Sequence, residues 1–158
     1  MLSLSDWGTT DRRTLVHLER CVLEVFARHV QLIGSSRESG GILLGRVRGS
    51  NLEIIEATVP SRFDERFPFL FIRKARQHRQ IADERWRCSG GTVRYLGEWH
   101  THPEELPQPS SVDLVEWRTL SAKRNDGRPL LAVIVGRAGL HVEFINDAGQ
   151  RLVLESIR

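Results

Sequence analysis

The sequence predicts an α/β protein in which helices cover the faces of a single mixed β-sheet. Apolar residues repeat at helical spacing in three stretches, and they alternate or cluster as in strands in five or six others. Glycine, proline and serine residues separate these stretches. The elements follow the order α-β-β-α-β-α-β-β-β, which is typical of one sheet with helices packed on it. The length of 158 residues suits one domain covering residues 1–158.

The first half of the chain is expected to contain a helix, a strand hairpin and a loop. An apolar stripe at helical spacing predicts a helix from about residue 10 to residue 31. Its members are Leu15, Leu18, Val22, Val25 and Phe26. Residues 42–47 and 52–59 then form two predicted strands joined by a turn. Residues 60–71, with two prolines and four phenylalanines, predict a surface loop whose phenylalanines anchor it to the core.

The second half begins with a basic helix and continues through strands and a further helix. The helix covers residues 73–88, and the alternating stretch 92–102 predicts a strand. Three prolines between residues 103 and 109 exclude a helix or a central strand there. A further helix is expected from Ser110, which is a favourable N-cap. Two or three more strands follow. They lie within residues 130–136, 141–146 and 151–157.

Composition and charge exclude several classes of protein. No apolar run is long enough to cross a membrane, and the N-terminus lacks a secretory signal pattern. Cys21 and Cys88 are expected to be buried or idle thiols, and so low a cysteine count suits a reducing cytoplasm. The net charge is only +3, and the basic stretch 73–87 is best explained as a solvated helix face. We therefore expect a cytoplasmic protein that binds neither nucleic acid nor a membrane.

The stretch GEWHTHPEELPQPSSVD, residues 97–113, carries the chemistry. His100 and His102 lie two apart on a predicted strand, so their side chains project from one face. Ser110 and Asp113 lie three apart in the first turn of the next helix and also share a face. Two imidazoles and one carboxylate are a ligand set of catalytic zinc, which keeps its fourth position for water.

Hydrolysis also requires a general base and a group that stabilises the oxyanion. Ser110 lies beside the expected ligands and can donate to an oxyanion, a role compatible with capping the helix. Two glutamates are candidates for the base. Glu98 precedes His100 by two residues on the same strand, where a supporting or solvated role is more plausible. Glu38 lies immediately before another predicted strand.

The string ESGGILLG, followed by HTHP and by the Ser110–Asp113 spacing, resembles the JAB/MPN+ (JAMM) metalloprotease motif. The resemblance implies a cytidine-deaminase-like α/β/α fold and one zinc ion with a bound water. It further implies that His100, His102 and Asp113 hold zinc, that Glu38 is the base and that Ser110 is the oxyanion donor. This family cleaves amide bonds, often isopeptide bonds at the tails of ubiquitin-like proteins.

Within the family, YLGEWHTHPE and PSSVD are similar to short JAB proteins of bacterial antiphage (CBASS) operons. That similarity implies an isopeptidase that removes a cGAS-like nucleotidyltransferase, joined to targets through its C-terminus by an E1/E2-like ligase. Peptidases that process sulfur-carrier proteins or phage tail components are alternatives. A non-catalytic scaffold is disfavoured by the complete motif. A nucleobase deaminase would need a P-C-x-x-C string, which Cys21 and Cys88 cannot provide.

The resemblance also gives residues 60–71 a second interpretation, because the corresponding insertion in relatives clamps the substrate tail by strand addition. In that case Phe69 and Phe71 would line the groove for the tail. Arg62 or Arg66 would then meet acidic residues of the substrate. An anchored surface loop and a substrate groove remain the two alternatives for this segment.

Overall fold

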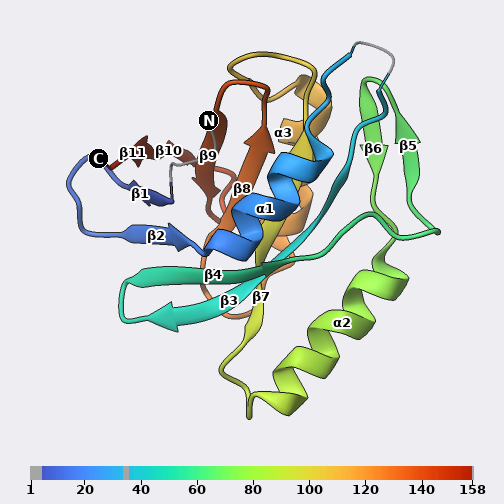
Figure 1. The fold of residues 1–158 in the computed structure, drawn as a ribbon. Helices are drawn as coiled ribbons and strands as arrows, with labels where there is room; N and C mark the ends of the chain where they lie inside the picture. The colour runs from blue at the N-terminus through green and yellow to red at the C-terminus, as the bar shows by residue number, and fades with distance from the viewer. Residues whose placement is uncertain (1–4, 34–35, 158) are drawn as a thin grey trace.

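The computed structural model describes residues 5–33 and 36–157, which form a large mixed sheet, three helices and a separate two-stranded sheet (Figure 1). The large sheet has nine strands. In spatial order they are β10 (Arg151–Val153), β9 (Leu140–Ile145), β8 (Leu130–Val135), β7 (Arg94–Thr101), β3 (Gly40–Arg48), β4 (Asn51–Ala57), β2 (Leu15–Leu18), β1 (Asp6–Gly8) and β11 (Glu155–Ser156). β7 pairs in parallel with β8 and antiparallel with β3, so the sheet is mixed, as predicted.

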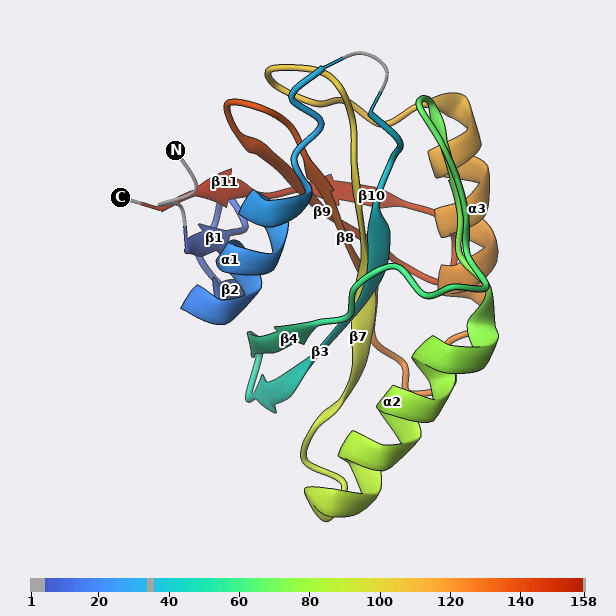
Figure 2. The same cartoon turned by 45° about the vertical axis from the view of Figure 1, so that its right-hand side comes forward.

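Helices cover both faces of this sheet. Figure 2 shows α1 (Arg20–His29) on one face, and α2 (Ala75–Cys88) and α3 (Ser111–Ala122) on the other. Each face of the sheet has its own hydrophobic core, because successive side chains along a strand point to opposite faces. Trp99 packs with Phe26 under α1, whereas Trp117 of α3 packs on Ile134 of β8. The predicted α/β/α fold class is therefore confirmed.

The predicted first helix is wrong in its N-terminal half. Residues Leu15–Leu18 form strand β2, and the helix begins only at Arg20. Within β2, Val16 and Leu18 are buried while their neighbours are exposed, which is a period of two. The apolar residues at positions 15, 18 and 22 also fit a helical stripe, so the sequence pattern alone did not separate the two structures.

The segment predicted as a loop contains a hairpin instead. β5 (Glu65–Phe67) pairs antiparallel with β6 (Leu70–Ile72), and Figure 1 shows the pair standing beside the main sheet. Phe67 and Phe69 are 48% and 78% exposed, so these two side chains do not anchor the segment to the core. Pro68 and Phe69 form the turn between these two strands. Each strand has only three residues, which is too short for an alternating pattern to predict it from the sequence.

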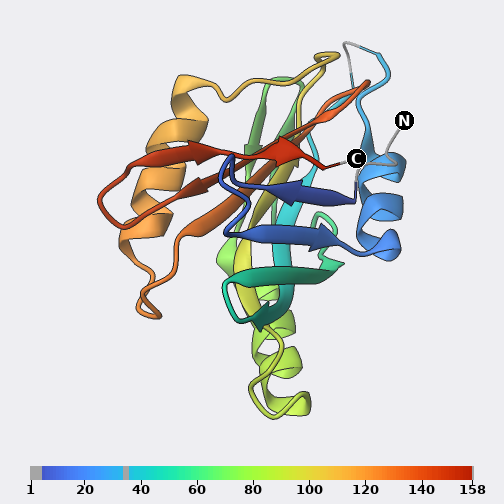
Figure 3. The same cartoon turned by 90° about the vertical axis from the view of Figure 1, so that its left-hand side faces the viewer.

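The last predicted strand, over residues 151–157, is divided in two. β10 pairs with β9 at one edge of the sheet, and β11 pairs with β1 at the other. Leu154, between them, is buried, and its amide donates to Val142 O. Figure 3 shows β11 lying next to β1, with β2 on the far side of β1. The sheet therefore ends in a strand of three residues on one side and a strand of two on the other.

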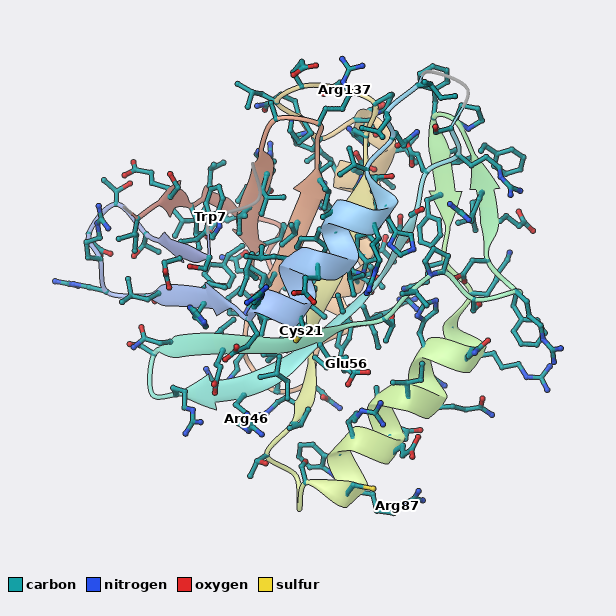
Figure 4. The ribbon with its side chains drawn as sticks, viewed as in Figure 1. Trp7, Cys21, Arg46, Glu56, Arg87 and Arg137 are labelled. Atoms are coloured by element: carbon teal, nitrogen blue, oxygen red, sulfur yellow. The ribbon has the colours of Figure 1, made fainter. Side chains whose placement is uncertain are left out.

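Two further expectations concern the surface. In the described part of the chain, no helix has the length and apolar character needed to cross a membrane. Cys21 and Cys88 are both free and exposed rather than buried, and Figure 4 labels Cys21 on α1. The basic helix α2 is a solvated helix, as predicted, and Arg85 pairs with Glu56, which projects from β4 towards it (Figure 4).

The start of β3 tolerates no side chain at Gly41. A Cβ there would lie 2.2 Å from the carbonyl oxygen of Thr58. We expect Gly41→Ala to destabilise the protein by about 2–3 kcal/mol, since overpacking against backbone forces the strands apart. Thermal unfolding should show a melting temperature roughly 5–10 °C lower. Gly139→Ala is the control, because its Cβ would meet only a methyl of the exposed Leu106. Equal melting temperatures for the two variants would contradict the prediction.

Candidate metal centre and active site

Two of the predicted ligands come from the centre of the sheet. His100 lies in β7, where it pairs with Gly40 of β3 and Ile134 of β8. His102 follows the end of β7, and its amide donates to Val135 O. Both side chains are buried, at 8% and 6% exposure. Because they are two apart along extended backbone, they project from the same face, as the sequence predicted.

The third predicted ligand, Asp113, comes from the first turn of α3. Ser110 is the N-cap, and its hydroxyl oxygen accepts from the Asp113 amide while the Ser110 amide donates to Asp113 Oδ2. This reciprocal capping box fixes the Asp113 carboxylate at the helix start. The Ser110 hydroxyl only accepts in this arrangement, so its proton is available to another acceptor.

His100, His102 and Asp113 converge on one point. The two Nε2 atoms lie 3.0 Å apart, and each lies 3.2 Å from an oxygen of Asp113. In a tetrahedral zinc site with bonds of about 2.0–2.1 Å, neighbouring ligand atoms are about 3.3 Å apart. Two imidazole nitrogens at this separation form a hydrogen bond only when one of them carries a proton. A cation bound between them would instead accept a lone pair from each nitrogen. The group can hold a metal ion, and the donor set fits zinc.

The electrostatics of the group also favour a cation. Burial by itself raises the pKa of Asp113, but hydrogen bonds from His100 and His102 outweigh burial and hold that pKa well below its usual range. Burial likewise lowers the pKa of His102, yet Asp113, helped by Glu38 and Glu104, raises it above the ordinary value. Negative charge therefore dominates around the His102 imidazole, and a cation at that position would take the place of its proton.

Glu38 lies beside this group although it is 62 positions before His100 in the sequence. The residue after it, Ser39, exchanges hydrogen bonds with Thr101 of β7: the Thr101 amide donates to Ser39 O, and the Ser39 amide donates to Thr101 Oγ1. One pocket is lined by Glu38 together with His100, Ser110 and Asp113. Burial raises the pKa of Glu38 to about 8, which suits a group that both accepts and returns a proton.

The alternative base, Glu98, is committed elsewhere. Both of its oxygens accept from the Arg73 guanidinium at 2.7 Å, and Oε1 also accepts from the Tyr95 hydroxyl at 2.6 Å. These hydrogen bonds occupy both oxygens of the carboxylate and hold it against the Arg73 guanidinium. Glu98 therefore supports the pocket wall, and of the two candidate bases Glu38 is the one that is free to act in the pocket.

Comparison with known proteins agrees with this geometry. The family of prokaryotic homologs of the JAB domain matches residues 20–146. This chain belongs to the prokaryotic JAB family. A CD-NTase/cGAS isopeptidase of Pseudomonas aeruginosa is 50% identical over 157 residues, which is 99% of each chain. A CD-NTase/cGAS isopeptidase of Escherichia coli is 37% identical over 108 residues, 68% of this chain and 67% of the relative.

The fold of this JAB protein is also found among solved structures. A protein of Desulfitobacterium hafniense, determined in solution, has a TM-score of 0.60 and covers 90% of each chain. Its sequence identity is 19%, so this likeness supports the fold alone.

The β5–β6 hairpin of the JAB domain brings some predicted substrate residues to the pocket and not others. Phe69 and Phe71 line the pocket opposite the start of α3. Arg66 belongs to β5 itself, and its guanidinium bonds Glu38 O and Ser39 Oγ rather than facing outward. Arg62 lies against the Phe63 ring, outside the lining of the pocket.

Sequence reasoning missed the polar network at the root of this hairpin. His78 of α2 is 1% exposed. Its Nδ1 lies 2.7 Å from Thr58 Oγ1, and its Nε2 lies 2.7 Å from Asp64 Oδ2. Asp64 also accepts from the Ser61 and Lys74 amides. These residues are scattered over 20 positions without a motif, so nothing in the sequence pointed to their meeting.

Proposed function

We propose that this JAB protein is a zinc-dependent isopeptidase that releases a cGAS-like nucleotidyltransferase, conjugated through its C-terminal tail, from target proteins in bacterial antiphage defence. One observation carries the proposal. Glu38 and Ser110, the residues needed for proton transfer and oxyanion stabilisation, line the same pocket as His100 and Asp113. The full-length identity with a CD-NTase/cGAS isopeptidase supports this choice of substrate. The expected setting is the cytoplasm, beside an E1/E2-like ligase that forms the conjugate.

Each side chain has a distinct part in the proposed reaction. His100, His102 and Asp113 would hold zinc, which supplies a Lewis acid and lowers the pKa of a water to about 7. Glu38 accepts a proton from the attacking water and returns it to the departing amine of the target as the carbonyl–nitrogen bond breaks. Ser110 donates its hydroxyl proton in a hydrogen bond to the oxygen of the former carbonyl.

The hairpin offers a place for the extended tail. β5 and β6 form a sheet of their own, so within the described residues the outer edge of β6 has no strand partner. Leu70 and Phe71 of β6 line the pocket. A tail that pairs with this edge would gain main-chain hydrogen bonds and place its terminal carbonyl near His100. This arrangement supports the groove interpretation of residues 60–71.

Replacing both Phe69 and Phe71 with alanine should weaken use of a conjugated substrate without loss of metal. Two aromatic walls of the pocket would disappear. We expect KM to rise by about 10-fold or more, since aromatic side chains that the bound tail covers each contribute on the order of 1 kcal/mol or more. Steady-state cleavage of a protein conjugate and elemental analysis of zinc measure the two properties. Unchanged KM would contradict the groove.

The proposed function is tested by incubating the purified protein with a nucleotidyltransferase conjugated through its C-terminus. Release of the intact nucleotidyltransferase, with its native C-terminus by mass spectrometry, is the expected result. Removal of metal with a chelator should stop release, and added Zn²⁺ should restore it. A linear fusion to the same tail tests whether the bond must be an isopeptide. No release of a conjugate by the zinc-loaded protein would contradict the proposal.

A further inference from the structure

We propose that Arg66 is a positioning residue that fixes the backbone of Glu38 and thereby the direction of its carboxylate. The inference rests on the proposed function for its effect on turnover. It replaces the sequence-based expectation that Arg66 meets acidic residues of the substrate. The β5–β6 hairpin is then a support for the catalytic base as well as a wall of the pocket.

The hydrogen bonds of Arg66 go to the Glu38 segment. Its Nε donates to Glu38 O at 2.9 Å, and its Nη2 donates to Ser39 Oγ at 2.6 Å. Within residues 5–33 and 36–157, no carboxylate lies within ion-pair distance of the Arg66 guanidinium. The planar fork of the guanidinium therefore spans two consecutive residues of one segment, which restricts that segment more than a single bond would.

The Glu38 segment is held from two sides. On one side Ser39 bonds Thr101 of the ligand-bearing strand β7. On the other side, besides Arg66, the Glu38 amide donates to Phe67 O at 2.8 Å. Residues 37–39 have no helix or strand of their own, so these bonds determine where the Glu38 carboxylate points. A displacement of the reacting groups by about 1 Å can lower the rate by about 100-fold.

The hairpin itself is fixed at both ends, so it can act as a support. At its root, Asp64 Oδ2 lies 2.7 Å from His78 Nε2 of helix α2. At its tip, Gln31 Nε2 donates to Pro68 O at 3.1 Å, and the same amide group donates to Ser36 O. Phe71 packs against Gly40, where a Cβ would lie 2.6 Å from the ring. One rigid element thus carries both the groove for the tail and the support for the base.

The kinetic test compares Arg66→Ala with Arg76→Ala, an exposed arginine on α2 beside the Phe63 ring. We expect Arg66→Ala to lower kcat by about 10- to 100-fold with KM within about 3-fold, the result for a group acting on chemistry rather than on binding. Arg76→Ala should match wild type, and Arg66→Lys should recover part of the loss. A rise in KM with unchanged kcat would overturn the proposal, because it would place Arg66 in contact with the substrate.

A double-variant comparison separates positioning from a general structural role. If Arg66 acts through the base, the loss from Arg66→Ala should be smaller in a Glu38→Asp background, where the carboxylate is already displaced, than in a Ser110→Ala background. Equal losses in the two backgrounds would contradict it. If Arg66→Ala does not fold, Arg66→Gln takes its place with the same expectations.

Amide exchange provides a readout that needs no substrate. In Arg66→Ala the Glu38 amide should exchange with solvent about 10-fold faster or more than in wild type or Arg76→Ala, because its segment opens more often. Unchanged protection would overturn the proposal, whatever the substrate is. Failure of the proposed function appears differently, as wild-type protein that does not cleave the conjugate while the exchange difference persists.

Discussion

Glu38→Gln is expected to lower hydrolysis by about 10³-fold or more while metal content is retained, since a general base contributes about 10²- to 10⁴-fold and an amide cannot take the proton. The side chain keeps its size and its place before β3. Single-turnover cleavage of a conjugate and elemental analysis measure the two effects. Activity within a few-fold of wild type would exclude Glu38 as the base.

The same variant should change stability with pH in a definite direction. Burial raises the pKa of Glu38 to about 8 from 4.5. A carboxyl whose folded pKa is raised disfavours folding as pH rises through that range, because its charged form is buried. In metal-free protein, Glu38→Gln should therefore melt at a higher temperature than wild type at pH 9, and the difference should shrink towards pH 4. A difference that is independent of pH would contradict the buried-charge explanation.

The second large effect is expected from His102→Ala, which should lose its metal ion on dialysis. Its Nε2 lies 3.0 Å from His100 Nε2 and 3.2 Å from Asp113 Oδ2, so its removal leaves two protein ligands of three. Zinc content should fall from about one ion per chain to a small fraction, and cleavage should fall with it. His17→Ala, which alters a partly exposed histidine paired with Asp6, is the matched control. Full zinc occupancy in His102→Ala would contradict the ligand assignment.

The sequence predicted the part of the site that depends on local geometry. Residues two apart on a strand and three apart in a first helical turn share a face whatever the rest of the fold does. His100, His102, Ser110 and Asp113 all belong to this class, and the structure brings them to one pocket or metal group as expected. Glu38 was singled out by resemblance to a family motif, because the pairing of β3 with β7 is a long-range event.

Other features depended on contacts that no local pattern contains. Val16 and Leu18 lie in β2, which pairs with β1 and β4. This long-range pairing determines the structure of the segment, although its apolar residues also fit the spacing of a helix. The hairpin at residues 65–72 is held by bonds to Glu38, Gln31 and His78, partners that lie outside the segment itself. The partners of Arg66 could not be foreseen, since a guanidinium can donate to a carboxylate or to a backbone carbonyl.

The short outer strands of the large sheet have a consequence for behaviour at high concentration. β10 and β11 contain three and two residues, so few unpaired backbone groups face solvent at either margin. Long edge strands with unpaired backbone groups are templates on which separate molecules can pair and aggregate. Within the described residues, the two edge strands of the large sheet are too short to offer a long template of this kind. Beside the pocket, β6 has an edge without a strand partner in the described part of the chain. Under the proposed function, the edge of β6 is the one beside the pocket, where main-chain pairing with an extended tail would serve cleavage.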